Sequence, residues 1–341
     1  LQIIFPDKEN QQSLLEATAH LVASDAEKGE IILTSGAIGS PQILQLSGIG
    51  DQAHLKKLGI DIVADRPGVG QNLQDHPACL VSRYSLPGAP KSHSTALRIP
   101  GTTTTNPVAL TKWLLKGSGP LTSPGCDHGG FIHLSEINSD NTTHADKEPN
   151  IQFRFLATKT ITPDGMSTIS DSYKSQRNHP NGFTIQTICA RPKSKQGTVY
   201  INSIDPLAKP KVYTPFFTDN QDLDLMVQAL KHARYIMDQP SLKKFSGQEE
   251  YPGPHIQSDQ DLREYAIRTV HTANALVGTC RLGASNDPNA VVDNQLKVIG
   301  VNGLRVCDSS IMPTLPGGQT ASSTLAIAEK AADILLQSVH S

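Results

Sequence analysis

The stretch "GEIILTSGAIGSPQILQLSGIG", Gly29 to Gly50, decides the fold class. The apolar run from Glu30 to Thr34 predicts a buried β-strand, and the Ser-Gly pair after it predicts a tight turn. Ser40-Pro41 predicts the start of a short helix, because serine caps helices and proline suits the first helical position. A strand, a turn and a helix in this order indicate an α/β fold.

The chain after this stretch alternates between strands, loops and helices. A Gly/Pro-rich loop and an alternating strand are followed by a Pro/Ser/Thr-rich excursion (87–107) and a short amphipathic helix that ends at Gly117. Residues 151–213 alternate as antiparallel strands do, which places Gln152 and Arg154 on one face of the first strand. Residues 219–239 and 320–339 have the apolar spacing of helices.

Composition limits the class of partner. The 341 residues are 37% hydrophobic and 18% charged, with a formal net charge of −2, which is ordinary for a globular protein. Lys and Arg are scattered, so whole-chain charge gives no signature for nucleic acid or for an anionic membrane surface. No run of about 18 apolar residues exists, so we expect no spanning membrane segment.

The cysteines and histidines indicate neither disulfides nor a metal. The five cysteines lie far apart and are odd in number, so we expect them to be reduced. None of the 12 histidines pairs with another histidine or with a cysteine at the spacing of metal ligands, and we predict no metal site.

Several motifs together resemble the glucose-methanol-choline (GMC) oxidoreductases. "GAIGSPQILQLSGIG", "VGQNLQDHP", "VVDNQLKV" and "GLRVCDSSIMP" match that family in order and spacing. The resemblance implies FAD as cofactor and an α/β (α+β) fold, in which a doubly wound FAD-binding sheet stands beside an antiparallel substrate-binding sheet. It divides the chain into part of the FAD-binding domain (1–78), the substrate-binding domain (79–270) and the C-terminal part of the FAD-binding domain (271–341).

The family's N-terminal G-x-G-x-x-G strand-turn-helix, which receives the ADP pyrophosphate, has no counterpart in the sequence. Neither Gly48-Ile49-Gly50 nor Gly68-Val69-Gly70 follows a strand and opens a helix with a third glycine in place. We therefore expect the chain to be the C-terminal part of a longer protein. Its partner would be the N-terminal FAD-binding part of the same protein.

The stretch "HTANALVGTCRLG", His271 to Gly283, lacks the family's acid/base residue. The family places a histidine three positions before a Gly-Thr pair, and here that position is Ala275. Its second active position, His or Asn, corresponds to Gln319, whose amide cannot accept a proton at neutral pH. Ordinary alcohol oxidation needs a base for the hydroxyl proton, so this chemistry is disfavoured.

"NALVGTC", "PGGQ", "SPGCD" and "IQFRF" resemble one branch of the family, the algal fatty acid photodecarboxylases. This resemblance implies light-driven decarboxylation of free fatty acids to alkanes or alkenes in a chloroplast enzyme. Arg154 would hold the carboxylate, Cys126 would lie beside it, Gln186 would line the substrate pocket, and Asn274 would face the flavin or the released CO2. The expected flavin contacts are Asn274, Ala275, Asp308, Gln319, Thr320 and Ala321.

Two other functions stay open. The first is a GMC alcohol dehydrogenase or oxidase with an unusual base such as His271, four residues before Ala275. The second is a non-catalytic flavin or lipid-binding relative, because a missing base is also typical of pseudoenzymes.

Overall fold

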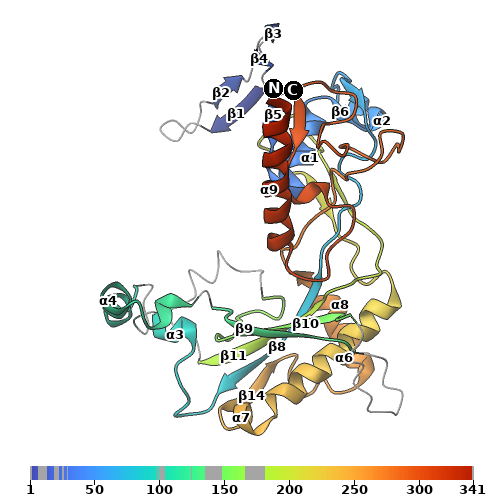
Figure 1. Ribbon diagram of the computed structural model, residues 1–341. Helices are drawn as coiled ribbons and strands as arrows, with labels where there is room; N and C mark the ends of the chain where they lie inside the picture. The colour runs from blue at the N-terminus through green and yellow to red at the C-terminus, as the bar shows by residue number, and fades with distance from the viewer. Residues whose placement is uncertain are drawn as a thin grey trace. The chain divides into compact units, whose positions relative to one another are not determined.

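The computed structural model describes residues 2–6, 14–18, 23–24, 27–28, 30–97, 99, 104–123, 125–134, 148–165 and 181–339 (Figure 1). The chain divides into two compact units. Unit 1 comprises residues 1–75, 195–215 and 274–341, and unit 2 comprises residues 76–194 and 216–273. In the N-terminal region, β1 (Gln2–Pro6) pairs with β2 (Leu14–Thr18) and β3 (Ala23–Ser24) with β4 (Glu27–Lys28).

Unit 1 is built around one parallel strand pair. β5 (Ile31–Leu33) pairs with β16 (Leu304–Val306), although 270 residues of sequence separate their ends. The pair packs into one apolar cluster with Leu44, Val291 and Ile334, which come from distant parts of the chain. The remaining elements are α1 (Gly36–Leu46), β6 (Ile49–Gly50), α2 (Gln52–Lys57), β7 (Ala64–Asp65), β12 (Thr198–Tyr200), β13 (Lys211–Tyr213), η3 (Ser309–Ile311) and α9 (Thr320–Val339).

The first helix begins earlier than the sequence predicts. It starts at Gly36, whose φ of +76° suits glycine, and Ser40-Pro41 lies inside it. Pro41 has no N–H to donate to the carbonyl of Ala37, four residues before it. The Thr279 hydroxyl donates to that carbonyl instead, at 2.6 Å. A contact distant in sequence therefore allows the proline inside the helix, and this contact could not be read from the local pattern.

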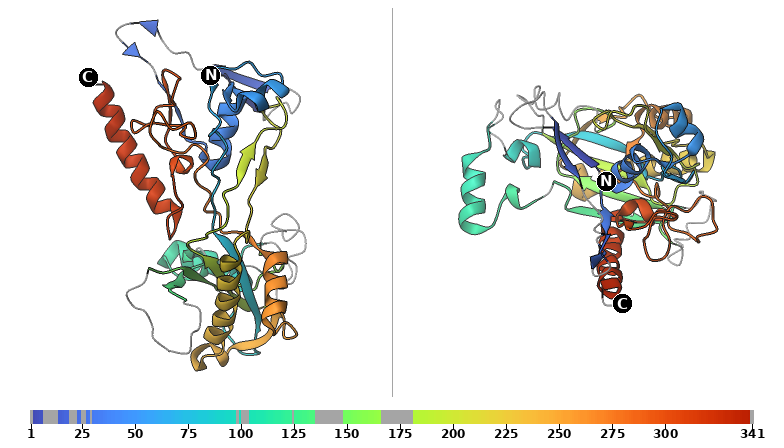
Figure 2. Two further views of the ribbon diagram at one scale, coloured as in Figure 1. Left: turned by 90° about the vertical axis from the view of Figure 1, so that its right-hand side faces the viewer. Right: turned by 90° about the horizontal axis from the view of Figure 1, so that it is seen from above.

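Unit 2 is an antiparallel sheet with helices on one face (Figures 1 and 2). The strand order is β14-β8-β11-β10-β9, and β15 also pairs with β8. α6 and α8 pack over one face through a large apolar cluster that includes Ile151, Phe153, Met226 and Leu262. The bounds are β8 (Pro77–Ser85), β9 (His128–Ile132), β10 (Ile151–Leu156), β11 (Gly182–Cys189), β14 (Ser246–Tyr251), β15 (His271–Thr272), α6 (Asn220–Met237), α7 (Pro240–Lys243) and α8 (Asp259–Thr269).

The other face of this sheet carries polar side chains. Ile151 and Phe153 of β10 point into the helix-covered cluster, so Gln152 and Arg154 lie on the opposite face, which confirms the predicted alternation. Arg154 stands directly across from Gln186 of β11 and Gly129 of β9. The open face therefore brings a cation and an amide together in the centre of the sheet.

The described residues between β8 and β9 form three short helices, α3 (His93–Leu97), α4 (Pro107–Lys116) and η1 (Pro120–Thr122). α4 ends at Gly117 in the left-handed conformation, as the sequence predicts. Across the described part of the chain, no helix is both long and apolar enough to cross a membrane.

Candidate functional site

Arg154 is the central side chain of the open face. It is half-buried, and burial lowers the pKa of its guanidinium, although a guanidinium stays charged in proteins. Within the described residues, its guanidinium makes no hydrogen bond and no ion pair, and it interacts electrostatically with Cys126. A partly desolvated cation without an anion is a strong binding site for a carboxylate.

Cys126 lies on a short loop that leads into β9. The Ser123 hydroxyl accepts the N–H of Gly125 at 2.9 Å and bonds the carboxylate of Asp127, which closes the loop. Burial raises the pKa of Cys126, while the nearby charge of Arg154 opposes that rise. Cys126 and Arg154 are therefore close enough to interact electrostatically, and burial favours the protonated thiol. Their roles beside a substrate carboxylate stay predictions.

Gly129 is a residue that sequence reasoning missed. It faces Arg154 across the β9–β10 pair, and a Cβ there would lie 2.4 Å from the carbonyl oxygen of Phe153. Only glycine allows β9 to approach β10 this closely. The Gly-Gly pair two residues after "GCD" is the signal that could have shown it.

Gln186 bonds to His271 on the same face. The Gln186 Nε2 lies 2.9 Å from His271 Nε2, and His271 Nδ1 lies 3.1 Å from the carbonyl oxygen of Thr269. A carbonyl only accepts, so Nδ1 carries the proton and Nε2 accepts from the Gln186 amide. Burial lowers the pKa of His271, which agrees with a neutral ring. His271, the alternative base of the sequence analysis, is thus already hydrogen-bonded at both nitrogens.

The predicted flavin contacts all lie in unit 1. Asn274 is exposed with a φ of +59°, which asparagine tolerates better than most residues. Ala275 is only 2% exposed, and its backbone N–H donates to Asp75 at 3.0 Å. A histidine at this position would need room that the packing around Ala275 does not offer.

Asp308 holds a turn together. Its Oδ2 accepts from the N–H of Gly36 at 3.0 Å and from the Ser40 hydroxyl at 2.5 Å, while Oδ1 accepts from the N–H of Ser310 at 2.7 Å. Three donors therefore surround this buried carboxylate. Asp308 fixes the turn between β5 and α1, which is the turn-capping alternative to a flavin contact that the sequence also allowed.

Gln319, Thr320 and Ala321 form the start of α9. Gln319 and Ala321 are exposed and Thr320 is half-buried. The first turn of an α-helix has N–H groups without acceptors inside the helix, and its dipole favours partial negative charge. This end of α9 can therefore hold the carbonyl edge of a flavin pyrimidine ring.

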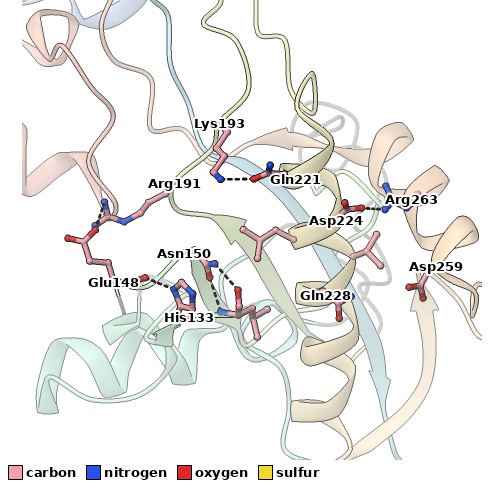
Figure 3. Close-up of a pocket in the computed structure, with 13 residues that line it drawn as sticks. His133, Glu148, Asn150, Arg191, Lys193, Gln221, Asp224, Gln228, Asp259 and Arg263 are labelled. Atoms are coloured by element: carbon pink, nitrogen blue, oxygen red, sulfur yellow. Dashed lines mark hydrogen bonds and ion pairs between the residues drawn. The ribbon is translucent and has the colours of Figure 1, made fainter. Parts of the chain in front are cut away.

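A cavity of about 690 Å³ lies elsewhere in unit 2, beside α6 (Figure 3). Among the described residues that line it there is no predicted site residue. Its basic side chains already have partners: Arg191 bonds Glu148 at 2.9 Å, Lys193 bonds Gln221 at 2.5 Å, and Arg263 pairs with Asp224. Arg154 is therefore the better place for a carboxylate.

The acidic, histidine and cysteine side chains of the described residues form no group of three or more that could hold a metal ion. The cysteines in these residues are Cys79, Cys126, Cys189, Cys280 and Cys307, and all five are free thiols.

Comparison with known proteins gives consistent matches. Two family models described as GMC oxidoreductase match residues 8–78 and 192–328. The chain is 41% identical to the chloroplastic fatty acid photodecarboxylase of Chlamydomonas reinhardtii over 91% of the chain and 50% of that protein. It is 33% identical to an alcohol dehydrogenase of Pseudomonas putida over 99% of the chain and 57% of that protein. A variant of Aspergillus oryzae RIB40 formate oxidase matches in structure, with a TM-score of 0.75 and 25% identity over 90% of the chain and 54% of that protein.

The chain thus spans about half the length of these relatives. The match over residues 8–78 is to the model of the N-terminal domain, which corrects one expectation. The chain is not a C-terminal part alone, because it includes a stretch of that N-terminal domain. The absence of the ADP-binding strand-turn-helix stays a prediction.

Proposed function

Since the chain belongs to the GMC oxidoreductase family, we propose that its protein is an enzyme that decarboxylates free fatty acids under light, giving CO2 and a hydrocarbon one carbon shorter. The observation that carries this proposal is the half-buried Arg154 guanidinium, which has no anionic partner among the described residues. A fatty acid supplies the missing carboxylate. The 41% identity to a fatty acid photodecarboxylase supports the same substrate class.

FAD is the cofactor of this family. The residues of unit 1 fit it, because the α9 N-terminus offers N–H donors and the exposed Asn274 and Gln319 offer amides. When bound, FAD would supply light-driven one-electron redox chemistry to the substrate carboxylate. Asp308 would act indirectly, by holding the turn before α1.

The role of Arg154 is to bind and orient the carboxylate. Its planar fork can form two parallel hydrogen bonds, which fix the pose of the carboxylate as well as its position. Gln186 stands directly across the strand pair, with its amide nitrogen held by His271. The Nε2 of Gln186 carries a second N–H, which a substrate carboxylate could accept.

Cys126 would hold a proton beside this carboxylate. The net reaction converts a carboxylate and one proton into CO2 and a hydrocarbon, so the reaction consumes a proton at the carbon that loses CO2. Burial raises the pKa of Cys126 and keeps Sγ protonated. The thiol would therefore hold a proton near the carboxylate end of the substrate. That proton would reach the substrate carbon directly or through a water molecule.

Ala275 and Gln319 support decarboxylation over alcohol oxidation. Neither can accept a hydroxyl proton, and His271 is engaged at both ring nitrogens. Decarboxylation of an ionised acid needs no base to begin. These residues leave alcohol oxidation without the proton acceptor that it requires.

A second candidate is an FAD-dependent alcohol dehydrogenase, which the 33% identity to the Pseudomonas putida enzyme favours. In this case His271 would be the base, because its neutral Nε2 retains a lone pair when Gln186 moves away. A non-catalytic flavin or lipid-binding role is the third reading. The chloroplast location stays a proposal that rests on the Chlamydomonas relative.

Matched substrates separate these functions. The full-length protein would be given palmitic acid or hexadecanol, each in blue light and in the dark, with an electron-accepting dye in the dark samples. We expect pentadecane from the acid in light only. Dye reduction by the alcohol in the dark would favour the dehydrogenase, and inactivity in all four samples would favour the non-catalytic relative.

A further inference from the structure

α4 carries an exposed apolar surface that the proposed reaction does not use. Val108, Trp113, Leu114 and Leu115 are 62%, 46%, 64% and 78% exposed, although each is a large hydrophobic side chain. Ala109 is the one buried residue of this helix. Contiguous apolar exposure of this kind marks a surface that binds another molecule.

Charge around this helix has one sign. Between Leu86 and Cys126 the sequence contains Lys91, Arg98, Lys112 and Lys116 and not a single Asp or Glu. Lys112 and Lys116 are on α4 itself and are exposed. The whole-chain net charge of −2 does not show this basic segment, because acidic residues elsewhere in the chain offset it.

The position of α4 makes the surface accessible within unit 2. The helix lies at the outer end of the excursion, beyond α3 and away from the strands of the sheet (Figures 1 and 2). Its closest packing is with the short helix η1 of the same excursion. α4 therefore lies at the periphery of unit 2 and is not part of its core.

We propose that α4 docks on an anionic lipid bilayer, lying in the plane of the interface. Tryptophan and leucine with flanking lysines are the composition of interfacial helices, where the apolar side chains enter the acyl boundary and the lysines meet the headgroups. A protein partner of a basic apolar helix would usually place acidic side chains at fixed positions. A bilayer has no such fixed positions, so it can accept the broad exposed surface of α4 that extends around the helix from Trp113 to Val108. Free fatty acids partition into bilayers, so docking would bring the enzyme to its substrate.

The test is vesicle binding by the full-length holoprotein, in the dark and without fatty acid. Vesicles of phosphatidylcholine with phosphatidylglycerol at 3:1 would be compared with pure phosphatidylcholine by co-sedimentation. We expect binding to the anionic vesicles that Leu114→Ser with Leu115→Ser weakens by about tenfold or more, since each leucine contributes through its buried area. Lys112→Glu with Lys116→Glu should weaken it by at least about tenfold through charge.

Matched controls keep the result specific. Ile204→Ser with Leu207→Ser changes two other exposed apolar residues, 65% and 51% exposed, and should leave vesicle binding unchanged. Lys56→Glu with Lys57→Glu makes the same charge change on α2, and it should weaken vesicle binding less than the two α4 lysine substitutions do. Absence of binding by the wild type, or equal binding by the leucine variant, would overturn the proposal.

Two further outcomes would show that α4 binds a protein surface instead of a bilayer. A change of oligomeric state in the leucine variant, with vesicle binding unchanged, would mean that a second copy covers α4. Loss of FAD or of thermal stability in that variant would mean that another part of the same protein covers it. Because the assay involves no turnover, a protein that binds vesicles but makes no hydrocarbon would refute the proposed function alone.

Discussion

Arg154→Lys tests how the carboxylate is held. The substitution keeps the positive charge of a half-buried side chain and removes the planar fork. An ammonium is a point charge that can meet one carboxylate oxygen well but cannot reproduce two parallel bonds. If Arg154 only attracts the acid by its charge, lysine should replace it; if Arg154 fixes the pose, lysine should fail.

The magnitude follows from the bonds lost. A hydrogen bond to a charged group contributes about 1.5–3 kcal/mol. Loss of one bond of a bidentate pair should therefore raise the Kd for the fatty acid roughly 10- to 150-fold, since about 1.4 kcal/mol is tenfold. A displaced carboxylate should also lower kcat, because small errors in position reduce reaction rates strongly.

The assay compares fatty acid affinity, light-driven turnover and FAD content in wild type and variant. Arg191→Lys is the matched control, because Arg191 pairs with the exposed Glu148 at 2.9 Å and lines the cavity beside α6, which does not include Arg154. The control should be close to wild type in all three measurements. A Kd within twofold of wild type together with normal turnover in Arg154→Lys would refute the role of Arg154 in orienting the carboxylate.

Three other perturbations have directions that the structure fixes. Ala275→His should lower light-driven turnover, and it should destabilise the protein by about 1–3 kcal/mol through overpacking at a 2% exposed site. It should not create dark alcohol oxidation, so dye reduction that appears in the variant would contradict this expectation. Thr279→Val should destabilise the protein by about 1–3 kcal/mol, because the Ala37 carbonyl loses its hydrogen-bond donor. Thr279→Ser keeps the hydroxyl and should not destabilise it. Equal urea midpoints for the two variants would show that this hydrogen bond is unimportant. Burial lowers the pKa of His271 from its ordinary 6.5, so the unfolded chain takes up the proton first, and stability should fall as the pH drops below 6.5. His271→Gln should flatten that fall, and an unchanged pH profile would remove His271 as its cause.

Local patterns predicted the elements of the fold well where packing agreed with them. α6 follows an Asp219 cap and α4 ends at Gly117, because capping chemistry is local. The start of α1 was predicted wrongly, since Pro41 normally indicates a first turn. The bond from Thr279 that permits it inside the helix comes from a residue more than 200 positions later.

The candidate site was predictable only in part for the same reason. Strand alternation placed Arg154 on the polar face, and the resemblance brought Cys126 to it. The pairing of Gln186 with His271 depends on the register of β15 on β8, which no local pattern gives. For Asp308 the sequence left a turn cap and a flavin contact as alternatives; its three donors show the cap, and the flavin contact stays a prediction.

The most direct test of the central claim is the stoichiometry of products from a fatty acid labelled with ¹³C at its carboxyl carbon. The full-length holoprotein would be illuminated with blue light, and labelled CO2 and hydrocarbon would be counted together, with an identical sample in the dark. We predict one labelled CO2 for each unlabelled hydrocarbon one carbon shorter, in light only. Consumption of the acid without hydrocarbon, or robust dark oxidation of an alcohol by the same preparation, would contradict the account.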